Sequence, residues 1–263
     1  MPAEMHYTTQ LQAGLGMVPE CMALLRLHEP GMTSPQLEEK ALADGLFSGC
    51  TARTVRNRVV EMFVPRFYRP DSAIADRLKQ LLDLTISIDV VRQIFLLHTA
   101  RAQRVLHDFV CSVYWPRQRQ GVDFLGIDQA RDFLLEATRM GRLNKPWSPI
   151  TIQRVSGYIT STCHDFELLG KGKGGKRPVQ HFRLRNQTAL YLAHDLHFSG
   201  VGDTSLVHHP DWALYGRHEP EQVLATLHDL AAEGHLLVQS GAGLVQISWK
   251  YPTWKEAIVA IAR

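Results

Sequence analysis

Residues 148–185 constrain the fold most, because their pattern changes from helical to strand-like around a glycine-rich basic stretch. Ser148 suits a helix N-cap and Pro149 suits the first helical position. Apolar residues then recur at helical steps on one predicted face: Ile152, Val155, Ile159, Cys163 and Phe166. The stretch LLGKGKGGKRPVQ follows at 168–180, and residues 179–185 alternate as in a strand. We therefore expect a helix, a basic tip and a strand.

A further helix is expected just before this one, at residues 126–141 (GIDQARDFLLEATRMG), with RLNKPW at 142–147 as the intervening turn. Helix, turn, helix, basic tip and strand follow the order of a winged helix, in which the tip lies along a duplex backbone. Gln153, Arg154 and Gly157 fall on the face opposite the apolar stripe. Gly157 either permits close approach of a backbone or phosphate, or is a plain surface glycine.

The N-terminal half predicts a second helix-turn-helix. Ser34, Pro35 and Gly45 mark the start and stop of one helix, and residues 51–63 (TARTVRNRVVEMF) form the next. Its expected buried stripe is Ala52, Val55, Val59, Met62 and Phe63. The other sides hold Arg53, Thr54, Arg56, Asn57 and Arg58, residue types that reach bases and phosphates. The alternative is an amphipathic helix with a solvated basic face, and Glu61 on that face would repel phosphate.

The rest of the chain completes a mainly α protein with short β-hairpins and winged helix-turn-helix character. Helices are expected at 72–84 and 88–114, and the pattern breaks at WPRQRQG, residues 115–121. We place the domain boundary there, giving a helical domain at 1–117 and a winged-helix-like α+β domain at 118–263. The tail predicts one more helix, a hairpin and a short helix capped by Thr253 and Glu256. That hairpin has no cation at its tip, so we interpret it as structural.

Composition excludes several classes. The 263 residues are 45% hydrophobic and 21% charged, which is typical of a folded protein rather than a disordered one. The four cysteines form no Cys-x-x-Cys pair, which argues against a zinc site and a disulfide framework. No stretch approaches the roughly 20 apolar residues of a membrane span, and no signal sequence is seen. We expect a cytoplasmic protein without membrane association.

The net charge of +3 is small, but the cations are gathered locally. They fall in stretches without acids at residues 47–60, 138–154 and 170–185. The candidate DNA-binding residues are Arg53, Thr54, Arg56, Asn57, Arg58, Arg142, Lys145, Gln153, Arg154, Lys171, Lys173, Lys176 and Arg177.

The glycine-rich stretch nearly matches the phosphate-binding loop G-x-x-x-x-G-K-[ST] of nucleotide hydrolases. Gly170, Gly175 and Lys176 fit it, but Arg177 stands where a hydroxyl must hold magnesium. The segment also follows a helix instead of a buried strand. The alternatives are a phosphate-binding tip or a disordered surface loop. The thirteen histidines show no metal-ligand spacing, and no nucleophile elbow or acidic metal cluster is present. We expect no enzyme activity, no cofactor and no metal.

Several stretches together resemble the BrxA family of the bacterial BREX phage-defence systems. They are YTTQLQAGLGMVPECMALL, TARTVRNRV, HDFVCSVYW and the tail from PDWALYGRHEP to WKEAIVAI. The resemblance implies a mostly helical two-domain protein with winged helix-turn-helix character that binds double-stranded DNA without catalysis. It also implies that the protein acts beside other BREX components, including a methyltransferase and an ATPase.

The sequence therefore predicts a non-enzymatic DNA-binding accessory protein of a BREX-type system, with weak sequence preference. About four to six phosphate contacts would make log K fall with log salt at a slope near −4 to −5. The main alternative is a protein-interaction adaptor that does not touch DNA. A third possibility is RNA binding, which would appear as preference for hairpin or single-stranded RNA.

Overall fold

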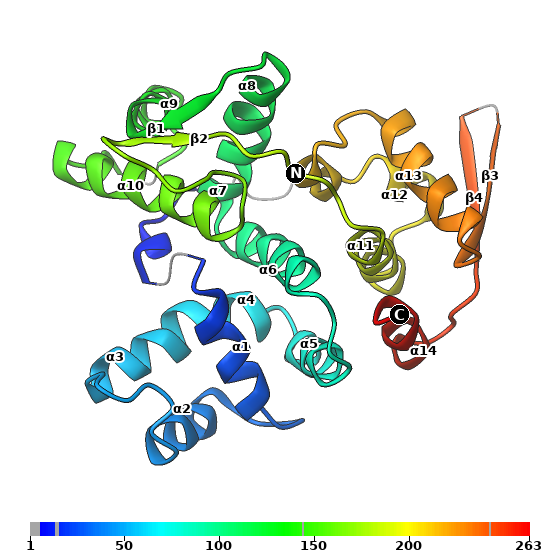
Figure 1. The fold of residues 1–263 in the computed structure, drawn as a ribbon, viewed down its shortest axis with the longest axis horizontal. Helices are drawn as coiled ribbons and strands as arrows, with labels where there is room; N and C mark the ends of the chain where they lie inside the picture. The colour runs from blue at the N-terminus through cyan, green and yellow to red at the C-terminus, as the bar shows by residue number, and fades with distance from the viewer. Residues whose placement is uncertain (1–5, 14–15, 144, 242) are drawn as a thin grey trace. The chain divides into compact units, whose positions relative to one another are not determined.

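The structure is a computed structural model that describes residues 6–13, 16–143, 145–241 and 243–263. It is mainly helical with two small antiparallel sheets (Figure 1), which confirms the expected mainly α class. No helix in the described ranges is long and apolar enough to cross a membrane.

Contacting residues divide the chain into two compact units. Unit 1 comprises Met1–Asp76 and Phe95–Phe182, and unit 2 comprises Arg77–Ile94 and Arg183–Arg263. Each unit is therefore made of two separate stretches of chain. The expected division into 1–117 and 118–263 concerns independent folding, which these contacts do not test, so it stays a prediction.

The first helices of unit 1 follow a 3₁₀ turn at Gln10–Ala13. They are α1 (Val18–Leu27), α2 (Ser34–Ala43), α3 (Ala52–Asn57), a π-helical turn (Arg58–Phe63) and α4 (Val64–Phe67). Helix α2 begins at Ser34 itself, with Thr33 in the N-cap position. Thr51 caps α3 by accepting the Thr54 N–H at 3.2 Å, as expected. The expected apolar stripe is buried except for Ala52, which is exposed.

The middle of the chain is also helical. Its elements are α5 (Ala73–Asp83), α6 (Ile88–Ala102), α7 (Arg104–Phe109), a π-helical turn (Val110–Tyr114) and α8 (Trp115–Arg119). The break expected at 115–121 is therefore too early. The helix continues from the π-helical turn directly into α8, and Pro116 lies in the first turn of α8. The chain turns at Gly121, whose φ of 70° suits glycine.

Unit 1 ends with a helix pair beside a small sheet (Figure 1). The elements are β1 (Phe124–Gly126), α9 (Ile127–Arg139), α10 (Pro149–Asp165) and β2 (Lys176–Pro178). Strand β1 pairs antiparallel with β2 through the Leu125–Arg177 register, and α9 packs on α10. Leu134, Ile159 and Phe166 are buried in this part of the core.

The strand expected at 179–185 is wrong. Strand β2 ends at Pro178, and beyond Val179 the chain leaves the sheet. In unit 2, the side-chain amide of Gln93 satisfies the backbone of the departing segment. Gln93 Nε2 donates to the Arg183 carbonyl at 2.8 Å, and the Arg185 N–H donates to Gln93 Oε1 at 3.0 Å. The alternation at 179–185 therefore reflects an extended chain. The Gln93 side chain, and not a neighbouring strand, satisfies the backbone of its last residues.

Unit 2 contains α11 (Asn186–Phe198), α12 (Asp203–Val207), a 3₁₀ helix (Pro210–Tyr215), α13 (Pro220–Ala232), β3 (Leu236–Gly241), β4 (Leu244–Trp249) and α14 (Trp254–Ile261). The expected tail hairpin is confirmed, since β3 pairs antiparallel with β4 from Leu236–Trp249 to Gly241–Leu244. The expected cap of the last helix is confirmed as well, because Thr253 accepts the Glu256 N–H. Tyr191, Trp212 and Tyr215 fill the centre of this unit.

Candidate nucleic-acid interface

Helix α10 presents a polar face because the apolar residues from Ile152 onward turn inward. Ser148 accepts the Thr151 N–H at 3.2 Å and Pro149 begins the helix, so the predicted start is confirmed. The predicted stripe from Ile152 to Cys163 is buried, which turns Gln153 and Arg154 outward into solvent. Neither side chain forms an ion pair with another described residue. The face therefore offers one amide and one free guanidinium.

The lysine hairpin, residues 169–179, follows α10. Bridges join Leu169 to Val179 and Lys173 to Lys176 around a two-residue turn. Both turn residues, Gly174 and Gly175, have positive φ (61° and 79°), the geometry of a type I′ turn that glycine adopts without strain. The segment therefore forms a hairpin with a tight glycine turn.

Glycine is also required where β1 meets this hairpin. A Cβ at Gly126 would lie 2.5 Å from the carbonyl oxygen of Gly175. The Ile127 N–H donates to that same carbonyl at 3.1 Å, so the start of α9 holds the turn directly. The tip is thus fixed to the helix pair by backbone contacts.

The lysines of the hairpin remain exposed. Lys171, Lys173 and Lys176 form no ion pair within the described residues, and Lys173 lies directly across from Lys176. Like charges in facing positions of a ladder destabilise it. This local cost is relieved when an anion lies against both ammonium groups. The hairpin therefore has the electrostatics of an anion-binding tip.

Arg177 differs from these lysines. It is half-buried, and its Nη2 donates to Ser161 Oγ on α10 at 3.3 Å. Its guanidinium therefore braces the hairpin against the helix. The order helix, hairpin turn and strand also lacks the strand-loop-helix context of a nucleotide-binding loop, which supports the sequence argument against that motif.

The residues expected on α3 lie in a different electrostatic setting. Arg53, Arg56 and Asn57 line a surface depression that Glu38 and Glu61 also line. These carboxylates lower the positive potential that the two arginines create. Thr54 is occupied by the cap, because its hydroxyl lies 3.0 Å from Thr51 Oγ1.

Arg58 does not lie free on the outer face of α3. Its guanidinium carbon is 4.5 Å from the ring centre of Phe47, and Nη2 is 4.0 Å from Glu20 Oε1. Arginine over an aromatic face is a stabilising cation–π contact. Arg58 therefore contacts other residues of unit 1. Of the arginines predicted to bind DNA at residues 51–63, Arg53 and Arg56 are exposed.

Arg142 and Lys145 lie in the turn between α9 and α10. Lys145 is exposed and has no ion pair with a described residue. Arg142 is half exposed, and its Nη1 lies 3.5 Å from Asp108 Oδ2 and 3.3 Å from Tyr7 Oη. Tyr7 and Asp108 were not predicted as site residues, because no local sequence pattern links them to Arg142.

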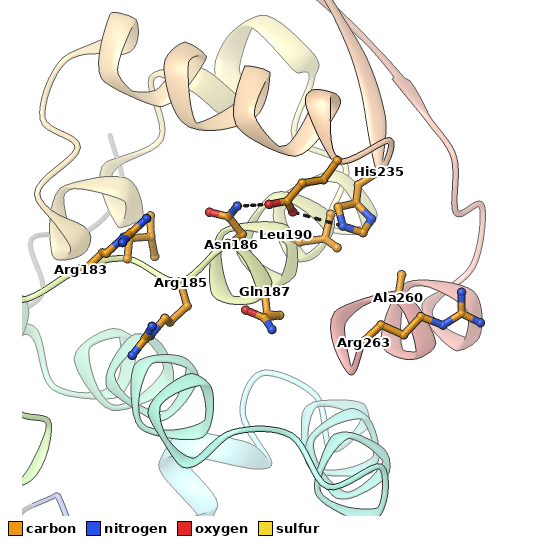
Figure 2. Close-up of a pocket in the computed structure, with 10 residues that line it drawn as sticks. Arg183, Arg185, Asn186, Gln187, Leu190, His235, Ala260 and Arg263 are labelled. Atoms are coloured by element: carbon orange, nitrogen blue, oxygen red, sulfur yellow. Dashed lines mark hydrogen bonds and ion pairs between the residues drawn. The ribbon is translucent and has the colours of Figure 1, made fainter.

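A pocket in unit 2 also collects basic residues (Figure 2). Arg183, Arg185, Arg263 and His235 line it together with Glu233. Acidic groups lie among these residues, because Glu233 contacts Asn186 and His235, and Arg185 pairs with Asp89. In this respect the pocket differs from the lysine hairpin, where none of the three lysines forms an ion pair with a described residue.

These features define a mainly helical protein with exposed cations on α10, on the turn before it and on the lysine hairpin, and with two more on α3. The BrxA family model matches residues 5–195, nearly three quarters of the chain. The chain therefore belongs to the BrxA family, which is a component of the BREX phage-defence systems. The match ends within α11, so the tail that also resembles the family lies outside the matched range. No curated protein matches the chain.

Proposed function

We propose that this protein is a non-enzymatic double-stranded DNA-binding accessory component of a BREX system. The observation that carries the proposal is the lysine hairpin, with a type I′ turn and three exposed lysines that form no ion pair with a described residue. Ammonium groups and glycine backbone amides are suited to the phosphates of a duplex.

The order of elements in unit 1 fits a winged helix-turn-helix. Helices α7 to α8, strand β1, helices α9 and α10, and the hairpin ending in β2 follow the sequence of that motif. In such an arrangement α10 enters the major groove and the hairpin lies along the backbone. Arg154 then pairs with guanine and Gln153 with adenine, while Lys145 and the hairpin lysines bind phosphates.

We assign α3 a secondary role in binding. Arg53 and Arg56 supply further phosphate contacts, but Glu38 and Glu61 beside them reduce their contribution. The mixed charge of that depression is the feature that favours the second candidate function, an adaptor that binds another BREX protein such as the methyltransferase or ATPase. Few base-reading side chains and many cations imply weak sequence preference.

The test is a mobility shift of a random-sequence duplex across a salt series. Wild-type protein should bind at low salt with a slope of log K against log salt near −4 to −5. A variant that combines Lys171→Ala, Lys173→Ala, Lys176→Ala and Arg177→Ala should have a shallower slope, smaller in magnitude by about 3. Arg177 contributes less than a lysine to this change because its side chain contacts Ser161.

Thermal unfolding of the variant checks that it remains folded. Absence of a shift with wild type at low salt would reject DNA binding and favour the adaptor. An unchanged slope in the variant would remove the hairpin from the interface. Competition by hairpin or single-stranded RNA that exceeds competition by duplex DNA would instead identify RNA as the ligand.

A further inference from the structure

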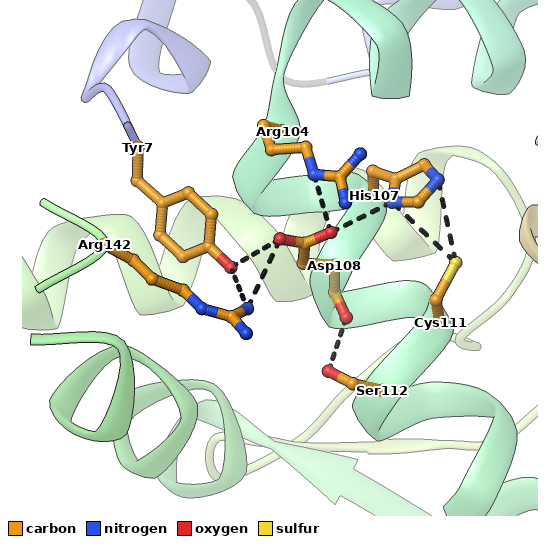
Figure 3. Close-up of polar contacts among 7 residues, drawn as sticks. All are labelled: Tyr7, Arg104, His107, Asp108, Cys111, Ser112 and Arg142. Atoms are coloured by element: carbon orange, nitrogen blue, oxygen red, sulfur yellow. Dashed lines mark hydrogen bonds and ion pairs between the residues drawn. The ribbon is translucent and has the colours of Figure 1, made fainter. Parts of the chain in front are cut away.

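The carboxylate of Asp108 on α7 is the centre of a polar cluster in unit 1 (Figure 3). Its Oδ1 accepts Arg104 Nε at 2.8 Å and lies 3.0 Å from His107 Nδ1. Its Oδ2 accepts the Tyr7 hydroxyl at 2.8 Å and lies 3.5 Å from Arg142 Nη1. One carboxylate therefore serves two guanidiniums, an imidazole and a phenol.

The ionised form of Asp108 is maintained in this cluster. Burial favours the neutral acid, but the hydrogen bonds from His107 and Tyr7 and the charge of Arg104 outweigh it and lower the pKa of Asp108. Burial raises the pKa of Tyr7, so its hydroxyl keeps the proton that it donates to Asp108. The hydrogen bond between Tyr7 and Asp108 thus has a fixed direction at neutral pH.

Tyr7 also holds the backbone of the turn that carries Arg142. The Tyr7 N–H donates to the Arg142 carbonyl at 2.9 Å, and Tyr7 forms a parallel bridge with Leu143. Its ring stacks on Phe133 of α9, with ring centres 5.9 Å apart. The same residue therefore fixes the main chain and the guanidinium of Arg142 at the entrance to α10.

We propose that Asp108 and Tyr7 are positioning residues that present Arg142 to a phosphate of bound DNA. The inference rests on the proposed function, and it assigns a specific task to the cluster. About half of the Arg142 side-chain surface is exposed (49%), so the guanidinium is held on one side and accessible on the other. A long side chain held in place loses less conformational entropy on binding.

The direction in which Asp108→Asn changes DNA affinity distinguishes a positioning role from simple electrostatic repulsion. A carboxylate close to DNA repels phosphate, so its removal alone would strengthen binding. If Asp108 instead positions Arg142, Asp108→Asn weakens binding even though the protein gains positive charge. Asp128→Asn is the matched control, since Asp128 on α9 also pairs with an arginine, Arg131 at 3.1 Å, at an exposed surface site.

The experiment measures duplex affinity and salt slope by mobility shift for single and double variants. Arg142→Ala should lose about one phosphate contact, which is about 8-fold in affinity at 0.1 M salt and about 0.9 in slope. Tyr7→Phe and Asp108→Asn should each weaken binding, on the order of 3-fold to 8-fold, bounded by the loss in Arg142→Ala. Combining either with Arg142→Ala should cause no further loss. Asp128→Asn should bind as tightly as wild type or more tightly.

Tyr7→Phe keeps the buried ring and the net charge, so it tests the idea even if Asp108→Asn fails to fold in a thermal melt. Tightening in Asp108→Asn, or additive losses in the Tyr7→Phe and Arg142→Ala pair, would overturn the inference. A normal salt slope in Arg142→Ala beside a reduced slope in the hairpin variant would overturn it too, while leaving the proposed function intact. If wild-type protein binds no duplex, the proposed function itself fails.

Discussion

Unit 1 and unit 2 each contain a helix followed by a hairpin, yet the two hairpins have different surfaces. Helix α10 leads into the lysine hairpin, whereas α13 leads into β3–β4. The exposed residues of β3–β4 are uncharged: Leu237, Gln239, Ser240, Gly241, Leu244, Gln246 and Ser248. Helix α13 exposes the acids Glu221 and Asp229 and contains no Lys or Arg. Similar local architecture therefore supports different chemistry, and the charges distinguish the two.

The largest expected effect comes from variants with equal charge change in the two hairpins. Lys171→Ala, Lys173→Ala and Lys176→Ala together remove three positive charges from the lysine hairpin. Gln239→Glu, Gln246→Glu and Ser248→Glu together add three negative charges to β3–β4. The first set should weaken duplex binding roughly 500-fold at 0.1 M salt. It should also reduce the magnitude of the slope of log K against log salt by about 2.7. The second should have a much smaller effect, measured by the same mobility shift.

Equal losses in the two sets would mean that binding follows net charge alone. The distinction between the hairpins would then have no functional meaning.

The second prediction concerns the stability of unit 2 at acid pH, where His194 on α11 packs against β4. His194 is buried, its Nε2 has no hydrogen-bond partner in the described residues, and Trp249 packs on its ring at 4.9 Å. Burial lowers its pKa to about 4, from about 6.5 in the unfolded chain. The unfolded chain therefore binds the proton more tightly. The stability that neutral His194 contributes is present above about pH 6.5 and is lost as pH falls toward 4.

Between pH 7 and pH 5 the loss should be about 2 kcal/mol in the stability of unit 2. Hydrogen exchange followed by mass spectrometry can compare peptides of α11 with peptides of α10 over this range. Protection should fall in α11 and persist in α10, and His194→Phe should flatten the dependence. Parallel loss in both helices would show that unit 1 shares the acid response.

The smallest expected effect comes from two opposite substitutions, glycine to alanine on α10 and alanine to glycine on α13. A Cβ at Gly157 of α10 would meet no atom within 4 Å, so Gly157→Ala should stabilise the protein by about 1 kcal/mol in thermal or urea unfolding. If the α10 backbone approaches DNA at this glycine, the same variant should also bind duplex more weakly. Ala225→Gly at an exposed site of α13 should lose about 1 kcal/mol and leave binding unchanged. Unchanged DNA affinity in Gly157→Ala would make it a plain surface glycine.

Local chemistry allowed most helices to be predicted. The caps at Thr51, Ser148 and Thr253 depend on residues three positions apart, so the sequence contains all the information that they need. The glycine turn of the lysine hairpin is similarly local. These elements position α10 and the hairpin, the central part of the candidate site.

Contacts between distant residues could not be predicted. Three such contacts depend on tertiary packing: the cation–π contact of Arg58 with Phe47, the hydrogen bond between Arg142 and Tyr7, and the hydrogen bonds of Gln93 with the 183–185 backbone. Strand-like alternation at 179–185 failed for this reason, because extended chain has the same period whether a strand or a side chain satisfies it. The family match adds membership in BREX systems but identifies no contact residue.

The pairing of Tyr7 with the turn before α10 has a consequence for the order of synthesis. Tyr7 precedes Arg142 by 135 positions. At about 5–20 residues per second, the N-terminal segment waits on the order of ten seconds before its partner has been translated. Tyr7, which is buried in the finished protein, has no Arg142 backbone to bond during that interval. The proposed DNA-reading surface is therefore completed late in translation, and nascent chains that end before residue 143 lack it.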